Sequence, residues 1–369
     1  MRRTRLLSGA MILAALLLVG SGLLPIASAR PASGAVNDAA TGPCLKYCVG
    51  WGVGRSTDGY GVILRTDDGG ITWQRQGQVG EIPDVDLQGV SAADDQHAWA
   101  VGEDVILHTR DGGLTWNQQE LPPGLPPDFG LLQVKALSPH LAFAVGGPGV
   151  LLRTTRRTQP GQGPQWVQMP TGPHLPSILF TDVDAVSPTE VWAVGGVISG
   201  GSSRSGLAIA HYTGRKWRPQ LITHSTQACS AMIGVSVLDA KTAWAVGGED
   251  CPPYRTVDGS TWQPVGSPVV PGSFDTNKVV AVTEDLIWIA HDNGFFRTIN
   301  GGADWQETPG CSGGHYCYSI SAAGTKFAWA TSIGVPPGDL YRWVHNHWES
   351  QVVPVSSSIV SISFPGARR

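Results

Sequence analysis

The chain has few charged residues, and their balance argues against several classes of partner. Charged residues make up 15% of the 369 residues, and no long basic run occurs. Without its basic N-terminal segment, the chain has 22 basic and 29 acidic residues, a net charge of −7. A mildly acidic chain without basic clusters is a poor match for nucleic acid or anionic lipid. We therefore expect neither as a partner.

Common signatures of enzymes and metal sites are also missing. The sequence contains no GxSxG, HExxH or phosphate-binding loop. None of its six cysteines has the paired CxxC spacing of a zinc site. We expect no catalytic residue, no metal and no cofactor.

Long apolar runs are absent except at the N-terminus. There, three arginines within residues 1–5 precede the run LLSGAMILAALLLVGSGLLPIA, and residues 27–29 form a small-residue cleavage site. We interpret residues 1–29 as a signal peptide and residues 30–42 as a flexible linker. The chain would then be exported, to an extracellular, periplasmic or cell-surface location. An uncleaved anchor is the alternative, because the run is long enough to span a bilayer.

The six cysteines of an exported chain predict disulfide bonds. The sequence alone allows many connectivities. Order along the chain favours the nearest partners, which pairs Cys44 with Cys48, Cys229 with Cys251, and Cys311 with Cys317.

Glycine, proline and tryptophan are abundant, with 48, 27 and 14 copies. This composition predicts short strands and tight turns rather than helices. One tryptophan recurs in the second half of each of seven units, at a mean spacing of about 46 residues. The seven are Trp73, Trp116, Trp166, Trp217, Trp262, Trp305 and Trp348.

A second aromatic residue begins a phrase of the type W-A-V-G in each unit. These residues are Trp51, Trp99, Phe143, Trp192, Trp244, Trp288 and Trp329. Each unit divides into four short strands, for example LQGVSA, HAWAVG, VILHT and LTWNQQ. A repeat of this length and content is typical of a propeller blade. We predict an all-β fold, a seven-bladed β-propeller of four-stranded antiparallel blades over residues 43–364.

The first strand of each blade has its own signature: apolar, any, small, apolar, Ser or Thr. It occurs at 87–91, 134–138, 183–187, 232–236, 279–283, 317–321 and 359–363. The last copy has no blade after it, and the first unit lacks a copy. We therefore predict that the C-terminal strand completes blade one and leaves no free inner edge. Residues 365–369 would form a tail.

Two near-copies of one phrase, RTDDGGITW at 65–73 and HTRDGGLTW at 108–116, resemble the Asp-box, or BNR repeat. The matching positions are Thr66, Asp68, Gly70, Thr72 and Trp73, then Thr109, Asp111, Gly113, Thr115 and Trp116, with Asp258 and Trp262 kept in the fifth unit. A short aspartate can accept backbone N–H groups across its own turn. A catalytic group is needed once, not in copies around a ring. We therefore interpret the phrase as structural.

The repeated units together resemble the photosystem II assembly and stability factor family over roughly residues 44–364. The most similar stretch is AWAVGEDVILHTRDGGLTW. The resemblance implies a seven-bladed propeller acting outside the cytoplasm as a non-enzymatic scaffold or assembly factor. A protein partner and a monomeric chain are the matching expectations.

An exported glycosidase or carbohydrate-binding propeller is the alternative, because Asp-boxes also occur in sialidases. Glycoside chemistry needs an acid and a nucleophile facing one cavity. The Arg-Ile-Pro phrase of sialidases is absent from the sequence. Sialidases of that type also have six blades rather than seven.

Enlarged loops suggest where a partner binds, because function in propellers concentrates in loops. The loops are expected at 120–130, 171–182, 195–206 and 333–339, on the face with the disulfides of Cys229 and Cys311. Disulfides that merely stabilise exported loops are the alternative. The predicted contacts are Asp182, Asp184, Arg204, Glu249 and Asp250.

A basic residue occupies the same place on the third strand of every unit. The residues are Arg65, His108, Arg153, His211, Arg255, Arg297 and Arg342. The family resemblance implies an Arg-rich patch that binds the client. We favour the alternative that these side chains stack on tryptophan or pair with neighbouring blades.

Overall fold

The computed structural model describes most of the chain from residue 49 onward. The described residues are 49–77, 81–127, 129–155, 165–172, 175–198, 204–222, 229, 231–248, 251–266, 275–311, 315–334, 340–354 and 357–365. The expected signal peptide (1–29), the linker (30–42) and the Cys44–Cys48 pair lie outside these ranges and stay predictions. No helix within these ranges is long and apolar enough to cross a membrane.

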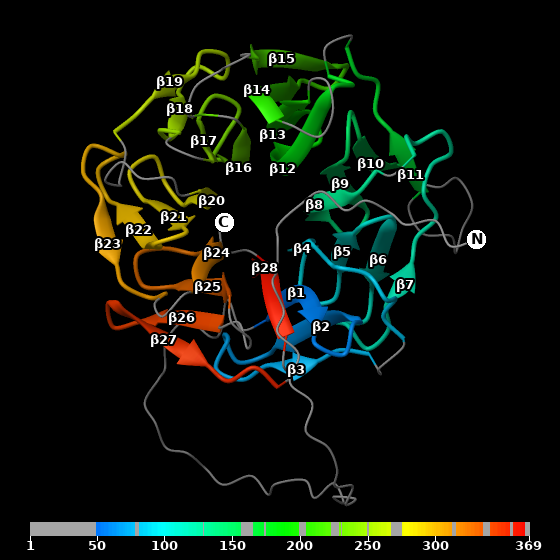
Figure 1. The fold of residues 1–369 in the computed structure, drawn as a ribbon, viewed down its shortest axis with the longest axis vertical. Coiled ribbons are helices and arrows are strands. Elements are labelled where there is room, and N and C mark those ends of the chain that lie inside the picture. Colours follow the sequence, from blue (N-terminus) through cyan, green and yellow to red (C-terminus); the bar gives the residue numbers. More distant parts are fainter. Residues whose placement is uncertain are drawn as a thin grey trace, which may run out of the picture. The chain divides into compact units, whose positions relative to one another are not determined.

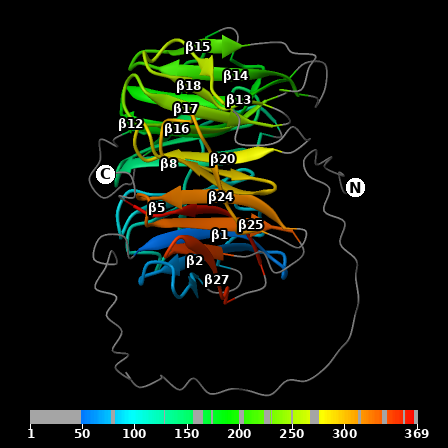
Figure 2. The same ribbon diagram turned by 90° about the vertical axis from the view of Figure 1, so that its left-hand side faces the viewer.

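The described strands form seven four-stranded antiparallel sheets around a central axis (Figure 1), and Figure 2 shows the ring from its side. Blade A contains β28 (Ser357–Ser363), β1 (Gly50–Ser56), β2 (Gly61–Thr66) and β3 (Gln74–Arg75). Blade B contains β4 (Gly89–Ala92), β5 (Ala98–Gly102), β6 (Val105–Thr109) and β7 (Asn117–Gln118). Blade C contains β8 (Leu131–Ser138), β9 (Leu141–Gly146), β10 (Leu151–Thr155) and β11 (Gln165–Gln168).

The other four blades have the same order from the axis outward. Blade D contains β12 (Ile178–Ser187), β13 (Glu190–Ile198), β14 (Arg204–Tyr212) and β15 (Trp217–Ile222). Blade E contains β16 (Met232–Val237), β17 (Ala243–Gly247), β18 (Tyr254–Thr256) and β19 (Gln263–Pro264). Blade F contains β20 (Thr276–Ala281), β21 (Ile287–His291), β22 (Gly294–Thr298) and β23 (Gln306–Thr308). Blade G contains β24 (Tyr316–Ala322), β25 (Ala328–Ile333), β26 (Leu340–Val344) and β27 (His347–Gln351). The predicted seven-bladed propeller is confirmed.

The C-terminal strand β28 closes the ring as predicted. It pairs antiparallel with β1, with Trp51 opposite Ser363. Just after β28, Phe364 stacks on Trp329 of blade G at 3.7 Å and meets Trp73 of blade A edge-on at 6.0 Å. The seam between the last and first blades is therefore both hydrogen-bonded and packed with aromatic rings.

The glycine of the W-A-V-G phrase has a steric reason. A Cβ on Gly54, Gly102 or Gly195 would overlap a backbone carbonyl oxygen at or just before the innermost strand of the same blade. The phrase therefore marks where the second strand passes closest to the chain entering the first. Blades F and G carry His291 and Ser332 at this place.

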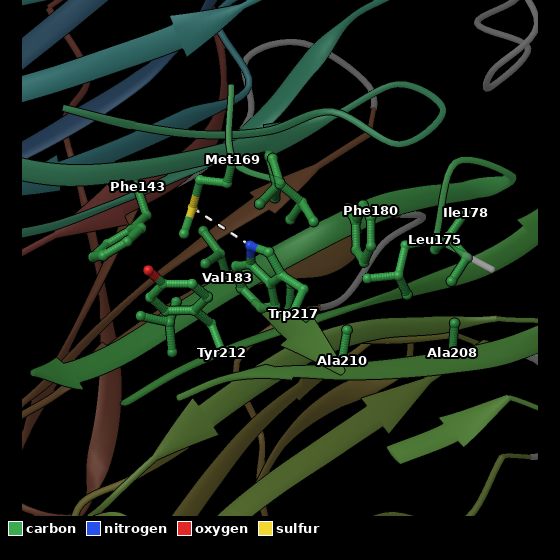
Figure 3. Packing of buried hydrophobic residues seen from close by; sticks show 14 of the residues in the cluster. Phe143, Met169, Leu175, Ile178, Phe180, Val183, Ala208, Ala210, Tyr212 and Trp217 are labelled. Carbon is green, nitrogen blue, oxygen red and sulfur yellow. Dashed lines mark hydrogen bonds between the residues drawn. The ribbon is translucent and has the colours of Figure 1, made fainter. Parts of the chain in front are cut away.

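Apolar side chains fill the spaces between blades, so both faces of a blade are buried. Figure 3 shows one such cluster, in which Phe143 of β9 and Val183 of β12 join Trp217 of β15. The indole N–H of Trp217 donates to Met169 Sδ at 3.4 Å. Burial on both faces explains why strands such as β5 are apolar without alternation.

The strand register defines two rings of residues on the innermost strands. Ring 1 consists of the residues opposite the aromatic of the second strand: Ser363, Ser91, Lys135, Asp184, Ser236, Val280 and Ser321. Ring 2 consists of the residues opposite the second-strand position that lies two residues after this aromatic: Ser361, Gly89, Gln133, Asp182, Gly234, Lys278 and Ser319.

The first-strand signature is misplaced in three blades. In blade B the small residue of the signature, Gly89, is the ring 2 residue. In the copies at 134–138, 183–187 and 279–283, the small residue lies three residues after the ring 2 residue of its own blade. In these blades the true ring 2 residues are polar: Gln133, Asp182 and Lys278. A sequence pattern of apolar and small residues could not separate the two registers.

Two expected loops are partly strand. Residues 178–182 of the loop expected at 171–182 belong to β12, and β13 and β14 extend well into the loop expected at 195–206. Apolar residues such as Val197, which is buried, lengthen these strands. Blade D therefore has the longest innermost strand of the ring, ten residues.

Removing the aromatic ring of Phe364 should open the seam. We expect Phe364→Ala to lower the free energy of unfolding by about 3–5 kcal/mol, the usual cost of deleting a buried phenylalanine. Urea unfolding followed by tryptophan fluorescence measures the loss. Val352→Ala is the control, since Val352 is 86% exposed. Equal stability of the two variants would contradict closure through this contact.

Candidate functional site

In the Asp-box turn of blade A, one aspartate accepts hydrogen bonds from residues on both sides of the turn. Asp68 Oδ1 accepts hydrogen bonds from the Thr66 hydroxyl at 2.8 Å and the Thr72 N–H at 2.9 Å, and Oδ2 accepts from the Thr72 hydroxyl at 2.6 Å. The Thr66 hydroxyl oxygen accepts the Gly70 N–H at 2.9 Å. Gly70 has a φ of 87°, in the region that favours glycine. The side-chain oxygens of Asp68 and Thr66 are thus engaged within their own turn.

The second and fifth blades repeat this arrangement. Asp111 accepts from the Thr109 hydroxyl at 2.8 Å and from the Thr115 hydroxyl at 2.6 Å. Asp258 accepts the Thr261 N–H at 2.6 Å in the shortened fifth copy. That backbone bond, with others, holds the pKa of Asp258 well below its ordinary value.

Blade F keeps the geometry with donor and acceptor exchanged. Asn300 stands where the other copies have aspartate, and Asp304 stands where they have threonine. The Asn300 side-chain amide donates to Asp304 Oδ2 at 2.9 Å, and Asn300 Oδ1 accepts the Asp304 N–H at 2.9 Å. The two departures from the pattern therefore compensate each other.

The basic residues of the third strands stack on the aromatic residues of the second. The measured pairs are Arg65 over Trp51 at 4.8 Å, His108 on Trp99 at 4.0 Å, His211 on Trp192 at 3.7 Å, Arg255 over Trp244 at 5.4 Å and Arg297 over Trp288 at 5.5 Å. Arg65 also donates to the Gly112 carbonyl of blade B at 2.7 Å. The interpretation as stacking is confirmed at these five positions, and Arg65 also shows the alternative of pairing with a neighbouring blade.

His108 is the most isolated of these side chains. It is 1% exposed, and its ring lies 9° from parallel to that of Trp99. Neither of its ring nitrogens has a hydrogen-bond partner among the described residues. Burial lowers the pKa of His108 to about 3, with a smaller contribution from nearby positive charge. The histidine is therefore neutral in the folded protein at ordinary pH.

Two disulfides lie on the face that carries the connections between blades. Cys229 bonds to Cys251, and Cys311 bonds to Cys317, as predicted. The Cys317 carbonyl accepts from the Asn277 amide at 3.0 Å, which links this disulfide to blade F. We call this side of the ring the disulfide face.

Asp292 stands out chemically on the disulfide face. Burial raises its pKa, and its carboxylate accepts from the Asn277 amide at 2.7 Å and the Asp275 N–H at 3.2 Å. No group of three His, Cys, Asp or Glu side chains in the described ranges is arranged to hold a metal ion. The hydrogen bonds of Asp292 are those of a turn-forming residue.

Two predicted contact residues lie in the wall of the central channel. Asp182 and Asp184 are 1% and 3% exposed and project from β12. Asp182 Oδ2 accepts the Val235 N–H at 2.9 Å, and Asp184 Oδ2 accepts the Val237 N–H at 2.8 Å. Both carboxylates thus cover the free edge of β16 in the next blade.

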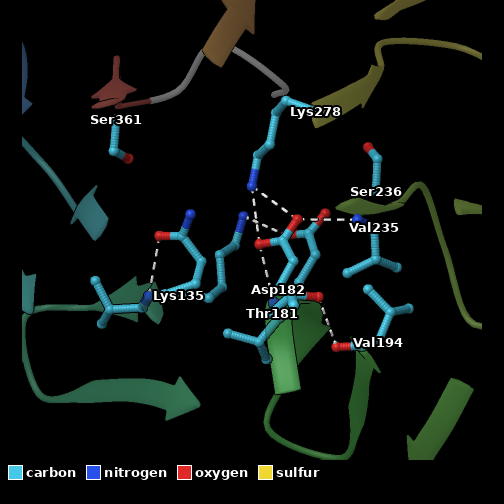
Figure 4. A network of polar contacts seen from close by, with 12 residues as sticks. Lys135, Thr181, Asp182, Val194, Val235, Ser236, Lys278 and Ser361 are labelled. Atoms are coloured by element: carbon cyan, nitrogen blue, oxygen red, sulfur yellow. Dashed lines mark hydrogen bonds and ion pairs between the residues drawn. The ribbon is translucent and has the colours of Figure 1, made fainter. Parts of the chain in front are cut away.

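Lysines from two other blades neutralise these carboxylates. Lys135 of blade C lies 2.7 Å from Asp184. Lys278 of blade F lies 2.8 and 2.7 Å from the two Asp182 oxygens, and Figure 4 shows this side chain pointing to Asp182. Neither lysine was selected from the sequence, because each pairing joins residues far apart in the chain. The sequence offered one signal: LLQVK at the start of β8 aligns residue by residue with LQGVS in the first strand of blade B, which places its lysine at the position of the final serine.

The other predicted contacts are Arg204, Glu249 and Asp250. Arg204 begins β14. Its side chain, and the whole of Glu249 and Asp250, lie outside the described residues. The structure therefore brings Asp182 and Asp184 together and leaves the role of the other three as a prediction.

A family model described as photosynthesis system II assembly factor YCF48 matches residues 46–310 of the chain. No curated protein sequence matches it. The matched residues run from β1 through β23, which comprises blades B to F and three of the four strands of blade A.

Solved structures share the fold. YCF48 bound to D1 peptide is 22% identical with a TM-score of 0.59, over 81% of this chain and 91% of that one. YCF48 from Cyanidioschyzon merolae is 18% identical with a TM-score of 0.56, over 81% and 96%. A catalytically inactive virginiamycin B lyase from Staphylococcus aureus with quinupristin is 13% identical with a TM-score of 0.55, over 73% and 84%. At these identities the likeness establishes the propeller architecture alone.

The adjacent residues Asp67 and Asp68 test the Asp-box. We expect Asp68→Ala to lower the free energy of unfolding by about 1–2 kcal/mol, because several donors lose their acceptor. Asp67→Ala should cost less than about 0.5 kcal/mol, since Asp67 makes only an exposed ion pair with Arg65. Thermal and urea unfolding provide both values. Similar losses in the two variants would refute the fastening role.

Buried His108 should make stability depend on pH. Its folded pKa of about 3 is below the ordinary 6.5, so its contribution is complete above pH 6.5 and is lost as pH falls. His108→Gln removes this term. From about pH 7.5 to about pH 5.5, the native protein should lose about 1 kcal/mol more than the variant. Parallel urea-unfolding curves across that range would show that His108 does not titrate as inferred.

Proposed function

This chain belongs to the photosystem II assembly factor YCF48 family, and we propose on that premise that it is an exported, non-catalytic scaffold that binds a protein client. The match over residues 46–310 supports this proposal most directly. A propeller similar in fold has been solved with a bound D1 peptide. By analogy, the client is a segment of a membrane-complex subunit exposed outside the cytoplasm, and the scaffold acts as a monomer.

The glycosidase alternative is not favoured. Glycoside hydrolysis needs a carboxylic acid and a second carboxylate facing one cavity. The two channel carboxylates, Asp182 and Asp184, are instead held by backbone N–H groups and lysines. A carboxylate fixed in this way is poorly placed to transfer a proton or to attack a sugar.

The disulfide face is the proposed client-binding surface. Two disulfides fix its loops, and Arg204, Glu249 and Asp250 are its proposed contacts. The opposite face carries the Asp-box turns, and the Asp68 carboxylate is engaged within its own turn. The five third-strand basic residues that stack on an aromatic residue of the second strand do not form a free client-binding patch.

Export is part of the same proposal. Disulfides persist in oxidising compartments and are rare in the cytosol, and the two disulfides among the described residues agree with export. The N-terminal segment has the composition of a signal peptide.

Capture of the client from the host tests the function. The full chain, tagged after its last residue, is cross-linked in host cells, and the bound proteins are quantified by mass spectrometry. We expect one subunit of a membrane complex to be enriched. Failure to enrich any such subunit, together with hydrolysis of a sugar by the purified chain, would refute the proposal.

Matched variants locate the binding face. Glu249→Gln with Asp250→Asn neutralises two charges in the segment between β17 and β18, which we expect on the disulfide face. Glu284→Gln with Asp285→Asn makes the same change on the exposed β20–β21 turn of the opposite face. We expect the first variant to recover about fivefold less client, equivalent to about 1 kcal/mol, and the control to match the native chain. Equal recovery would exclude the disulfide face.

A further inference from the structure

The central channel contains a cavity of about 320 Å³. Its lining comes from the innermost strands of the ring, including Ser91 of β4, Lys278 of β20 and Ser361 of β28. Val186 and Pro365 lie at or just beyond the C-terminal ends of such strands, on the side of the Asp-box turns. The cavity therefore lies toward the face opposite the disulfides. It is at the small end of the range for ligand sites, which begins near 300 Å³.

The charged groups of the channel are oriented. Within each ion pair the carboxylate is buried and the ammonium faces the open space: side-chain exposure is 2% for Asp182 against 19% for Lys278. The Asp184–Lys135 pair repeats this contrast, at 4% and 24%. Asp182 also accepts the N–H groups of Val183 and Val235, so its charge is compensated within the wall. The lumen consequently meets the positive ends of both pairs.

The hydroxyl groups of the lining are also oriented as donors. Ser361 Oγ accepts the Val90 N–H at 3.2 Å, Ser363 Oγ accepts the Ala92 N–H at 3.1 Å, and Ser91 Oγ accepts the Ala136 N–H at 3.0 Å. Each oxygen is thus occupied by a backbone donor. Within the described part of the chain, no acceptor is recorded for the O–H of Ser361 or Ser363. A hydroxyl that has accepted one bond still has a hydrogen to donate.

Lys278 reaches the site because the intervening strand has no side chain at ring 2. The lysine starts from blade F and pairs with Asp182 of blade D (Figure 4). Between these two blades it passes Gly234 of blade E. A Cβ on Gly234 would lie 3.2 Å from the Lys278 Cα and 3.3 Å from the Val279 nitrogen. The lysine donates two of its three N–H groups to Asp182. The third is available to a ligand in the cavity.

We infer that this cavity binds a small oxyanion, a carboxylate or a phosphate, through Lys278 and the hydroxyls of Ser91, Ser361 and Ser363. Donor groups line the lumen, while the carboxylates of Asp182 and Asp184 are already engaged by backbone N–H groups and lysines, so an acceptor-rich ligand fits better than a cation. The site does not depend on the proposed client and lies away from the disulfide face.

Binding is measured on the full chain with acetate, succinate and inorganic phosphate as separate probes. Isothermal titration calorimetry and thermal unfolding are run at matched ionic strength. We expect saturable binding of at least one probe at millimolar concentration, with a matching rise in the unfolding temperature. The probe that binds identifies the source as an organic acid or a phosphate. Absence of saturable binding for all three would overturn the inference.

A pair of double variants separates the site from general charge effects. Asp182→Asn with Lys278→Met removes one channel ion pair, keeps the net charge and leaves an amide oxygen for the Val235 N–H. Asp58→Asn with Arg75→Met removes the ion pair between those residues, which lies outside the cavity. We expect the channel variant to bind about tenfold more weakly, the loss of one charge-assisted hydrogen bond, and the control to bind as the native chain does.

Circular dichroism and tryptophan fluorescence establish that both variants are folded. If the channel variant does not fold, Val186→Glu at the mouth and Val352→Glu elsewhere replace the pair. These two variants add the same charge at exposed positions. Weaker binding only in the mouth variant supports the site, whereas equal binding in either matched pair overturns it.

Discussion

The innermost strand of each blade has one edge that no other strand of its sheet can pair. In an isolated sheet, such an edge leaves backbone N–H groups without acceptors, which is costly when they are buried. Here the preceding blade supplies the acceptors: Ser361 and Asp182 from ring 2, and Ser91, Asp184 and Ser236 from ring 1. The ring thus depends on side chains that bond the backbone of the next blade. The aromatic packing, the stacked cations and the closing strand act around this inner circle of bonds.

The outer parts of the blades could be predicted from the sequence, because their determinants are local. An aromatic residue at the start of the second strand, the Asp-box turns and the surplus C-terminal strand all follow from the spacing of Trp51, Asp68 and residues 357–363. The inner circle could not be predicted in the same way. Register shifts near residues 131–133, 180–182 and 276–278 change which residue faces the next blade. The pairing of Lys278 with Asp182 also spans 96 residues, and no local pattern specifies it.

Blade F shows that the Asp-box is a pattern of hydrogen bonds rather than of residue names. Asn300 and Asp304 exchange the donor and acceptor roles that Asp68 and Thr72 have in blade A, and the turn keeps its bonds. The sequence differs from the Asp-box phrase at two positions, whereas the hydrogen bonds across the turn are retained. Such compensated changes help to explain how family members with low sequence identity retain one fold.

The seam at β28 also determines when the fold can be completed. Gly52 pairs with Ile362, so β1 cannot complete its strand pairing until the C-terminal strand β28 is present. Contacts between residues so distant in sequence raise contact order and slow the final folding step. Until β28 has been made, blade A has only three of its four strands. Closure of the ring therefore depends on synthesis of the C-terminal strand, whatever the order in which the middle blades form.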